Sequence, residues 1–361
     1  MTKDQIEIEN IQNKIKAVVN SFAEIERDEN GKHLRASIEP KKNEINNPQF
    51  KHLDTLARLF TTPQEDHVAV YYNGKKIMIA SSQAKPKAAK ETLEVLSKFA
   101  GVPSLENYKE LVKLAIRNIY LWLEKDAKKS TLLEVSLKEA QLNVFKSFKS
   151  LIQDYYEKII KNQEELTPER LEKMKTCAKE LFQEIKSLES SESETRDFMW
   201  DYLIPFDDAN IIANAIQTKE LGEEIVTAIK NPNELADFIA GKEGMHPEMK
   251  IINKLCQIGF QPAEFSYLGS SKLVCMPCHF ALGVINKTRF NEKLLVAGTH
   301  GSTYPNWIIP TNFSLVEQQE ILEKIEGCRH KRLADWELST ADFGQWEALI
   351  RQTELPSPNK G

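Results

Sequence analysis

The 361-residue sequence has few cysteines and lacks any long apolar run. Its longest apolar stretches fall far short of the about 20 residues that a membrane-spanning helix requires. Its first residues, MTKDQIEIENIQNK, are charged and lack the apolar segment of a secretory signal. The five cysteines are odd in number and scattered, which is not typical of a disulfide framework. We therefore expect a chain without a membrane span that resides in the reducing cytoplasm.

The sequence also lacks a strong excess of charge of one sign. It contains 48 Lys and Arg against 53 Asp and Glu, for a net charge of −5. The protein as a whole is therefore not a typical polyanion binder, although a local basic groove stays open. The length corresponds to roughly two domains of about 150 residues each, and a hydrophobic content of 41% is enough for a buried core.

The spacing of apolar residues changes along the chain and predicts its organisation. Two β-rich runs, Val68–Tyr72 and Lys76–Ala80, flank Asn73-Gly74 and predict a hairpin with a type I′ turn. Helical spacing then continues nearly to residue 240, after which strands and helices alternate. The expected fold is α/β, a mixed sheet flanked by helices, with a large all-helical insertion and a helical N-terminal segment. The expected parts are an N-terminal helical segment (1–60), a first hairpin of the core (61–83), a helical insertion (84–239), the remainder of the core (240–325) and a C-terminal helix and tail (326–361).

Two short motifs carry the chemistry. With His246 as the N-cap of a helix, Pro247 occupies the first helical position, and both His246 and Glu248 can face the helix end. Cys275 and Cys278 begin a second helix in the same way. Helix N-termini favour anions and therefore thiolates, which are good zinc ligands. One imidazole and two thiolates leave a fourth zinc position for water, which the ion acidifies, and Glu248 can then move protons.

These motifs resemble the cytidine deaminase superfamily. HPEMK (246–250) and SKLVCMPC (271–278), followed by GTHGSTYPNW (298–307), are similar to its divergent toxin-type branch of nucleic-acid deaminases, found in intracellular bacteria and fungi. The resemblance covers the hairpin and roughly residues 240–325. It implies a deaminase-like fold, Zn²⁺ as cofactor and hydrolytic deamination of cytosine or adenine in a nucleoside, nucleotide or nucleic acid. It also implies His246, Cys275 and Cys278 as metal ligands and Glu248 as the catalytic residue.

The sequence departs from the superfamily pattern at three positions. Pro247 stands where Ala or Val is usual, Val274 stands where Pro is usual, and Pro277 lies between the cysteines. The ligand types and the glutamate are intact, so the departures concern geometry more than chemistry.

Further residues are candidates for substrate contacts. Ser81 and Ser82 follow the second strand, where superfamily members often contact the base or sugar. His300, Tyr304 and Trp307 lie on a loop after a predicted strand, where an aromatic ring either stacks on the substrate base or packs the end of the sheet.

Other readings of the chain remain open. The two cysteines also fit a redox pair, and a purely structural zinc could take Cys256, His279 or His300 as a fourth ligand. Segment 84–239 could bind a protein partner, with the zinc unit as scaffold. The toxin-type resemblance favours a nucleobase substrate, single-stranded nucleic acid among the options, and an effector delivered into a host cell.

Overall fold

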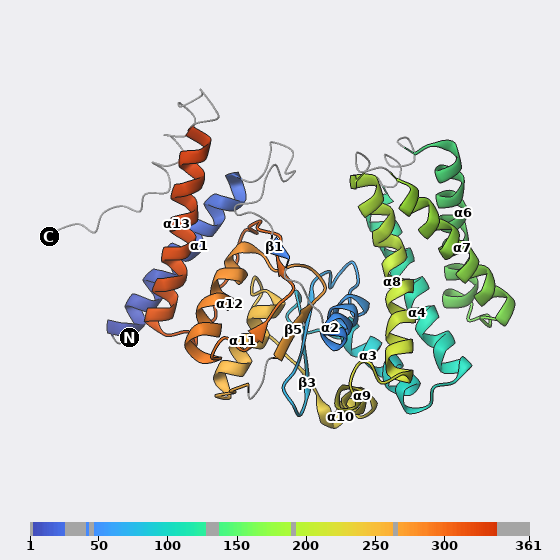
Figure 1. Ribbon diagram of the computed structural model, residues 1–361, viewed down its shortest axis with the longest axis horizontal. Coiled ribbons are helices and arrows are strands. Elements are labelled where there is room, and N and C mark those ends of the chain that lie inside the picture. Colours follow the sequence, from blue (N-terminus) through green and yellow to red (C-terminus); the bar gives the residue numbers. More distant parts are fainter. Residues whose placement is uncertain are drawn as a thin grey trace. The chain divides into compact units, whose positions relative to one another are not determined.

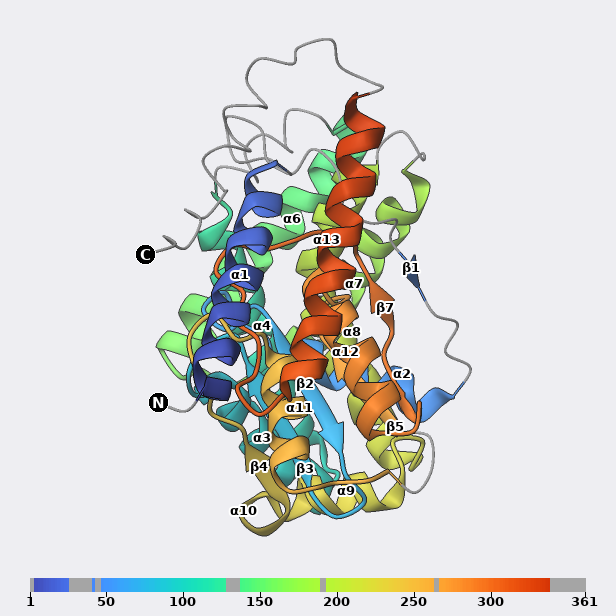
Figure 2. The same cartoon turned by 90° about the vertical axis from the view of Figure 1, so that its left-hand side faces the viewer.

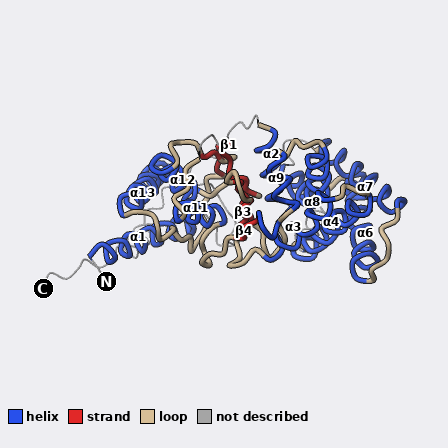
Figure 3. Tube along the Cα trace, turned by 90° about the horizontal axis from the view of Figure 1, so that it is seen from below, coloured by secondary structure: helices blue, strands red, loops and turns tan. Residues whose placement is uncertain are grey.

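The computed structural model describes residues 3–25, 41–42, 47–127, 137–188, 193–262 and 266–337. The chain divides into two compact units. Unit 1 comprises Met1–Ile45, Ala240–Leu268 and Lys272–Gly361, and unit 2 comprises Asn46–Ile239 and Gly269–Ser271. Helices make up most of the described chain and strands a small part (Figure 3). Within this described part, no helix combines the length and apolar character needed to cross a membrane.

The fold is mixed α/β, as the sequence predicts. Among the described residues, one sheet has five strands in the order β4 (Ala236–Phe238), β3 (Ile77–Ser81), β2 (Val68–Tyr72), β5 (Ser266–Ser270) and β6 (Leu294–Leu295). Strand β5 (Ser266–Ser270) runs through the boundary, so its first residues belong to unit 1 and its last to unit 2.

Unit 2 contains the hairpin and most of the helices (Figure 1). Its elements are α2 (Pro48–Leu59), β2 (Val68–Tyr72), β3 (Ile77–Ser81), α3 (Lys87–Gly101), α4 (Leu105–Lys125), α6 (Glu139–Tyr155), the π-helical turn η1 (Tyr156–Lys161), α7 (Pro168–Ser187), α8 (Ser193–Gln217), α9 (Glu223–Lys230), α10 (Pro232–Leu235) and β4 (Ala236–Phe238). Helix α8 packs on α2, α4 and α7, and α6 packs on α7.

The predicted hairpin is present, but its turn differs from the prediction. Strands β2 and β3 are antiparallel, with Val68 opposite Ser81 and Tyr72 opposite Ile77. The N–H of Asn73 donates to the carbonyl of Lys76 at 3.2 Å, so the turn is centred one residue later than expected. Only Gly74 in this turn has a positive φ, of 81°, whereas a type I′ turn requires two such residues. The type I′ prediction was therefore wrong. The Asn73 side chain accepts the N–H groups of Lys75 and Lys76 and so stabilises a different turn.

The segment predicted to be entirely helical ends in a short strand. Strand β4 pairs in parallel with β3, with Ile77 opposite Ala236 and Ile79 opposite Phe238. On the other side of the hairpin, the N–H of Ser271 donates to the carbonyl of Val68 at 2.9 Å. Unit 2 therefore includes three strands and the end of a fourth.

Unit 1 consists of short strands covered by helices. Its elements are α1 (Lys3–Ile25), β1 (Lys41–Lys42), α11 (Pro247–Gln257), the start of β5, α12 (Met276–Arg289), β6 (Leu294–Leu295), β7 (Gly298–Thr299) and α13 (Leu315–Glu337). Strands β5 and β6 are parallel, and β1 pairs with β7. The segment KLLVAGTH (293–300) thus pairs with two different partners, Leu294–Leu295 with β5 and Gly298–Thr299 with β1. The predicted C-terminal tail, beyond residue 337, lies outside the described residues.

The four long helices of unit 1, among the described residues, pack in a series. Helix α12 packs on α11 and on α13, and α13 packs along α1 (Figure 1 and Figure 2). The side of α1 that carries Ile15, Val19 and Phe22 is almost completely buried. Full burial of such a side chain contributes about 1.5–3 kcal/mol, so α1 is an integral part of the unit.

Candidate metal centre

The start of helix α11 places His246 and Glu248 at one helix end. His246 is the N-cap, with extended backbone dihedral angles (φ −65°, ψ 152°), and Pro247 is the first helical residue. The proline costs no hydrogen bond there, because the first N–H groups of a helix have no partner within it. The cap and start agree with the sequence-based prediction.

The start of helix α12 repeats this arrangement. Cys275 is the N-cap (φ −72°, ψ 165°), and Cys278 lies in the first turn. Just before it, the N–H of Val274 donates to the carbonyl of Gly298 at 3.1 Å, and the N–H of His300 donates to the carbonyl of Val274 at 3.2 Å. These two hydrogen bonds fix the chain where it enters the helix. Both cysteine side chains are buried.

The three predicted ligands meet at one point. Nδ1 of His246 lies 3.3 Å from Sγ of Cys275 and 3.4 Å from Sγ of Cys278, and the three atoms all lie within 4.8 Å of one another. Tetrahedral coordination with usual Zn–N and Zn–S bond lengths separates nitrogen and sulfur by about 3.5 Å. The donor atoms therefore fit a zinc ion without rearrangement of the chain.

The charges of this group also suit a cation. Burial alone lowers the pKa of His246, and Lys250 lowers it further, but the Cys275 thiolate and Glu248 together raise it to about 9. Burial raises the pKa of Cys275, yet hydrogen bonds from Cys278 and His246 lower it well below its usual value. Burial and the neighbouring Cys275 raise the pKa of Cys278. The Cys275 thiolate thus favours a positive charge beside it, and a metal cation bound there would displace the proton from His246.

Glu248 lies beside the donors and is fully buried, with 0% of its surface exposed. One of its carboxylate oxygens lies within 4.8 Å of a ring nitrogen of His246. The chain therefore places a carboxyl group next to the three donors but outside the group that they form.

Tyr304, one of the predicted substrate residues, lies between the rings of His246 and His300 and contacts both. The ring of Tyr304 meets the ring of His246 edge-on, with centroids 5.9 Å apart, and meets the ring of His300 in the same way at 5.6 Å. Tyr304 is 37% exposed. The Nδ1 atom of His300 accepts the N–H of Ser302 at 3.1 Å, which leaves the other ring nitrogen to carry the proton of the neutral imidazole.

Trp307 has a different environment from Tyr304. It is only 1% exposed, and its indole Nε1–H donates to Sγ of Cys278 at 3.2 Å. Sequence reasoning grouped this tryptophan with the substrate contacts and missed its contact with a metal-ligand candidate. The sequence signal that could have indicated this contact was the place of Trp307 in segment 298–307, which follows the two metal-binding motifs.

Ser81 and Ser82 belong to unit 2. Ser81 ends β3 and is completely buried, while the N–H of Ser82 donates to the carbonyl of His67 at 2.8 Å. Their role in substrate binding stays a prediction from the sequence.

The residues considered as a fourth ligand lie apart from the three donors. Among the described side chains, neither Cys256, His279 nor His300 joins the group formed by His246, Cys275 and Cys278. Burial raises the pKa of the Cys256 thiol, and the nearby Arg289 offsets only part of this rise.

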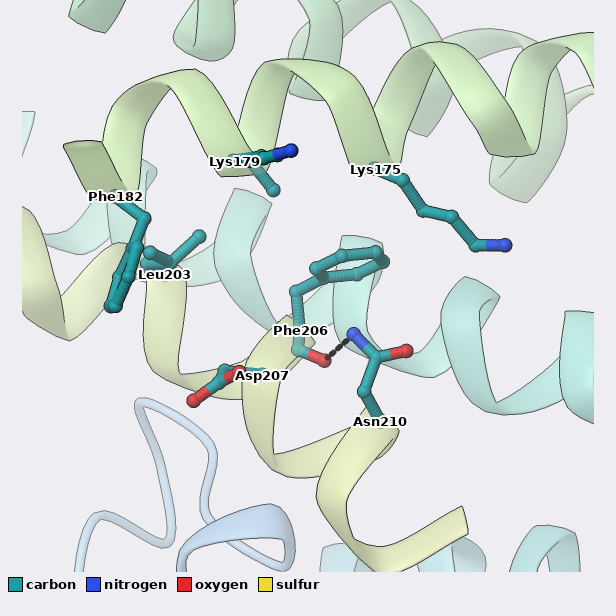
Figure 4. A pocket seen from close by; sticks show the side chains of 8 residues that line it. Lys175, Lys179, Phe182, Leu203, Phe206, Asp207 and Asn210 are labelled. Atoms are coloured by element: carbon teal, nitrogen blue, oxygen red, sulfur yellow. Dashed lines mark hydrogen bonds between the residues drawn. The ribbon is translucent and has the colours of Figure 1, made fainter. Parts of the chain in front are cut away.

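A separate cavity of about 340 Å³ lies in unit 2, between helices α7 and α8 (Figure 4). Its lining is mainly apolar, with charged and polar groups from both helices: Lys175, Ala178, Lys179, Phe182, Leu203, Phe206, Asp207 and Asn210. Lys175 is ion-paired with Glu172 at 2.7 Å, and burial raises the pKa of Asp207.

The fold and site define a mixed α/β protein with an imidazole and two cysteine sulfur atoms at the starts of two helices. A protein-family model described as OTT_1508-like deaminase matches residues 245–311, which include all three donors and Glu248. This match supports assignment to a deaminase-like superfamily, as the sequence motifs predicted. A search of curated proteins and a search of solved structures each found no match.

Proposed function

We propose that this protein is a zinc-dependent hydrolytic deaminase that replaces the amino group of a cytosine or adenine base with oxygen from water. The observation that carries the proposal is the convergence of His246, Cys275 and Cys278 at nitrogen–sulfur distances that suit a zinc ion, with Glu248 buried beside them. The deaminase-family match to residues 245–311 supports the same reaction class.

Each residue has a distinct part in this proposal. His246, Cys275 and Cys278 would hold Zn²⁺ and leave one position free. When bound, Zn²⁺ lowers the pKa of water to about 7 and so supplies hydroxide at neutral pH. Glu248 accepts the proton released from water and returns it to the departing amine, so that water and the aminated base give the oxo base and ammonia.

A catalytic zinc site and a purely structural one differ in the number of protein ligands. The donor group of the described residues has three members and excludes Cys256, His279 and His300. Structural zinc sites are usually closed by four protein ligands, whereas catalytic sites keep one position for water. The three-donor arrangement therefore favours chemistry over a purely structural role.

Tyr304 and His300 are the proposed contacts for the base. The exposed fraction of Tyr304 leaves ring surface available beside His246. Aromatic stacking tolerates different bases, so it does not by itself select cytosine or adenine.

The test is ammonia release from a panel of cytidine, deoxycytidine, adenosine, their nucleotides, and single-stranded DNA and RNA. We expect activity on at least one member, and loss of that activity when zinc is removed by a chelator and its return when zinc is restored. Absence of ammonia release by zinc-loaded protein from every member would contradict the proposal. The member that reacts would also distinguish free nucleosides from nucleic acid.

The proposed effector role and delivery into a host cell rest on the resemblance of the motifs to toxin-type deaminases. The matching test is expression of the wild-type chain and of Glu248→Gln in host cells. We expect base changes in host nucleic acid from the wild type alone. Equal mutation spectra in both would contradict this role.

A protein-interaction role for the helical segment is a second candidate, and the cavity between α7 and α8 favours it. Apolar walls with Lys179 at the rim suit an apolar side chain next to an acidic residue of a partner. Loss of partner capture in Phe182→Ser, with capture kept in Glu248→Gln, would support this role. The opposite pattern would contradict it.

A further inference from the structure

The indole of Trp307 makes a specific contact with a predicted metal ligand. Its Nε1–H donates to Sγ of Cys278 at 3.2 Å, and the side chain is 1% exposed. An indole has one donor and no acceptor, so its buried N–H needs a partner. Here that partner is a sulfur atom that faces His246.

The loop that carries Trp307 is fixed on both sides of the indole. The N–H of Asn306 donates to Oδ1 of Asn20 on α1 at 2.8 Å, and the N–H of Ile308 donates to the carbonyl of Gly244 at 3.3 Å. Gly244 has a φ of +85°, and a Cβ there would lie 2.5 Å from the carbonyl oxygen of Asn306. The close approach therefore requires glycine at this position.

These contacts connect the indole to both helices that supply metal donors. Gly244 lies two residues before His246, the N-cap of α11, and Cys278 lies in the first turn of α12. The loop is thus held against the chain leading into one helix, while the indole reaches the sulfur of the other. A rigid loop with these two contacts can fix the position of the Cys278 sulfur relative to the His246 imidazole.

We propose that Trp307 is a positioning residue for the metal, which orients the Cys278 sulfur through its N–H···S hydrogen bond and withdraws electron density from it. The inference rests on the zinc site of the proposed function. It gives Trp307 a role other than the substrate contact predicted from the sequence. Hydrogen bonds to metal ligands set ligand orientation and basicity, and their loss typically weakens metal affinity about 10–100-fold.

The test compares zinc affinity and the Co²⁺ spectrum of wild type, Trp307→Phe and a control, Trp200→Phe. Trp200 lies in unit 2, with its ring 5.5 Å from Phe182, and has no part in the donor group. Competition with a chromophoric chelator gives the affinity, and the sulfur-to-cobalt charge-transfer band reports the electron density on sulfur. We expect about 10–100-fold weaker zinc binding and a band shifted to lower energy in Trp307→Phe, with neither change in Trp200→Phe.

A second replacement protects the test against a folding defect. Benzothienylalanine at position 307 keeps the two-ring shape of tryptophan but lacks the N–H, and we expect it to reproduce the spectral shift in folded protein. Wild-type affinity and an unshifted band with this replacement would overturn the role of Trp307 while leaving the zinc site intact. Failure of the wild-type protein itself to bind zinc would overturn the zinc site of the proposed function, and this inference with it.

Discussion

Nδ1 of His246 lies 3.3 Å from Sγ of Cys275, although 29 positions separate the two residues in the chain. Each residue is the N-cap of its own helix, α11 and α12. Two local capping geometries therefore produce a non-local pair of donors, and Cys278 completes the group from the first turn of α12.

The first prediction concerns metal content. Cys275→Ser and His246→Ala each remove one of three donors, so we expect zinc to fall from about one ion per chain to nearly none after dialysis. Elemental analysis of purified protein measures this. Cys256→Ser is the matched control, since Cys256 lies outside the donor group of the described residues. Full zinc content in Cys275→Ser would contradict the assigned ligand set.

The second prediction concerns Tyr304. If the substrate base stacks on this ring, Tyr304→Ala should raise KM about 5–160-fold, the equivalent of about 1–3 kcal/mol of lost stacking. Tyr304→Phe should keep most of the affinity because it keeps the ring. Zinc content should be normal in both. A KM unchanged by Tyr304→Ala would exclude the stacking role.

The third prediction concerns acid stability through Glu317, which is 5% exposed. Its carboxylate accepts the Arg289 Nε–H at 2.6 Å and the backbone N–H of Ser314 at 2.6 Å. Burial raises its pKa, but these partners lower it from 4.5 to about 2. As the pH falls, Glu317 is protonated in the unfolded chain before it is protonated in the folded protein. The stabilisation that its carboxylate contributes is therefore present above about pH 4.5 and is lost as pH falls toward 2.

Glu317→Gln should therefore lower the free energy of unfolding at pH 7 by roughly 3 kcal/mol and flatten its pH dependence below pH 4.5. Urea unfolding at several pH values measures both effects. Glu320→Gln is the control on the same helix, where the more exposed carboxylate lies 3.7 Å from Lys324. The same acid-induced loss of stability in wild type and Glu317→Gln would contradict the assignment.

The fourth prediction concerns Gly269 in β5. A Cβ at this position would lie 2.6 Å from the carbonyl carbon of Leu53 in α2, a backbone atom that cannot move aside alone. We expect Gly269→Ala to destabilise the protein by about 1–3 kcal/mol, the usual cost of overpacking. Gly283→Ala is the control, since nothing lies within 4 Å of its added methyl group, and this helical site should gain about 0.5–1 kcal/mol. Thermal unfolding compares the two, and equal effects would contradict the steric explanation.

The parts of the structure that were predicted correctly depend on local signals. Asn-Gly between β-rich runs gave the hairpin, although not its turn type. His246-Pro247 gave the start of α11 in the same way. In each case neighbouring residues decide the conformation, so a short stretch of sequence is sufficient.

The parts that were missed depend on distant partners. Strand β4 has only three residues and follows directly on α10, and its extended form is defined by pairing with β3. The segment 293–300 divides because Leu294–Leu295 pair with β5 whereas Gly298–Thr299 pair with β1. No local pattern specifies which strand edge a short segment will meet.

The candidate site shows the same division. The donor set could be predicted because two helix starts carry it, but the contact of Trp307 with Cys278 depends on the path of a loop. In that loop Asn306 adopts a left-handed conformation with a φ of 61°. Spacing along the sequence did not distinguish a tryptophan that faces substrate from one that faces a ligand sulfur.

The most direct test of the account measures zinc content and ammonia release together, on one preparation each of wild type and Glu248→Gln, with the substrate that the panel identifies. We predict about one zinc ion per chain in both proteins, because Glu248 lies outside the donor group. We predict a deamination rate at least about 100-fold lower in the variant, because a proton-transfer group contributes 10²–10⁴-fold to the rate. Equal rates in the two zinc-loaded proteins would contradict the account.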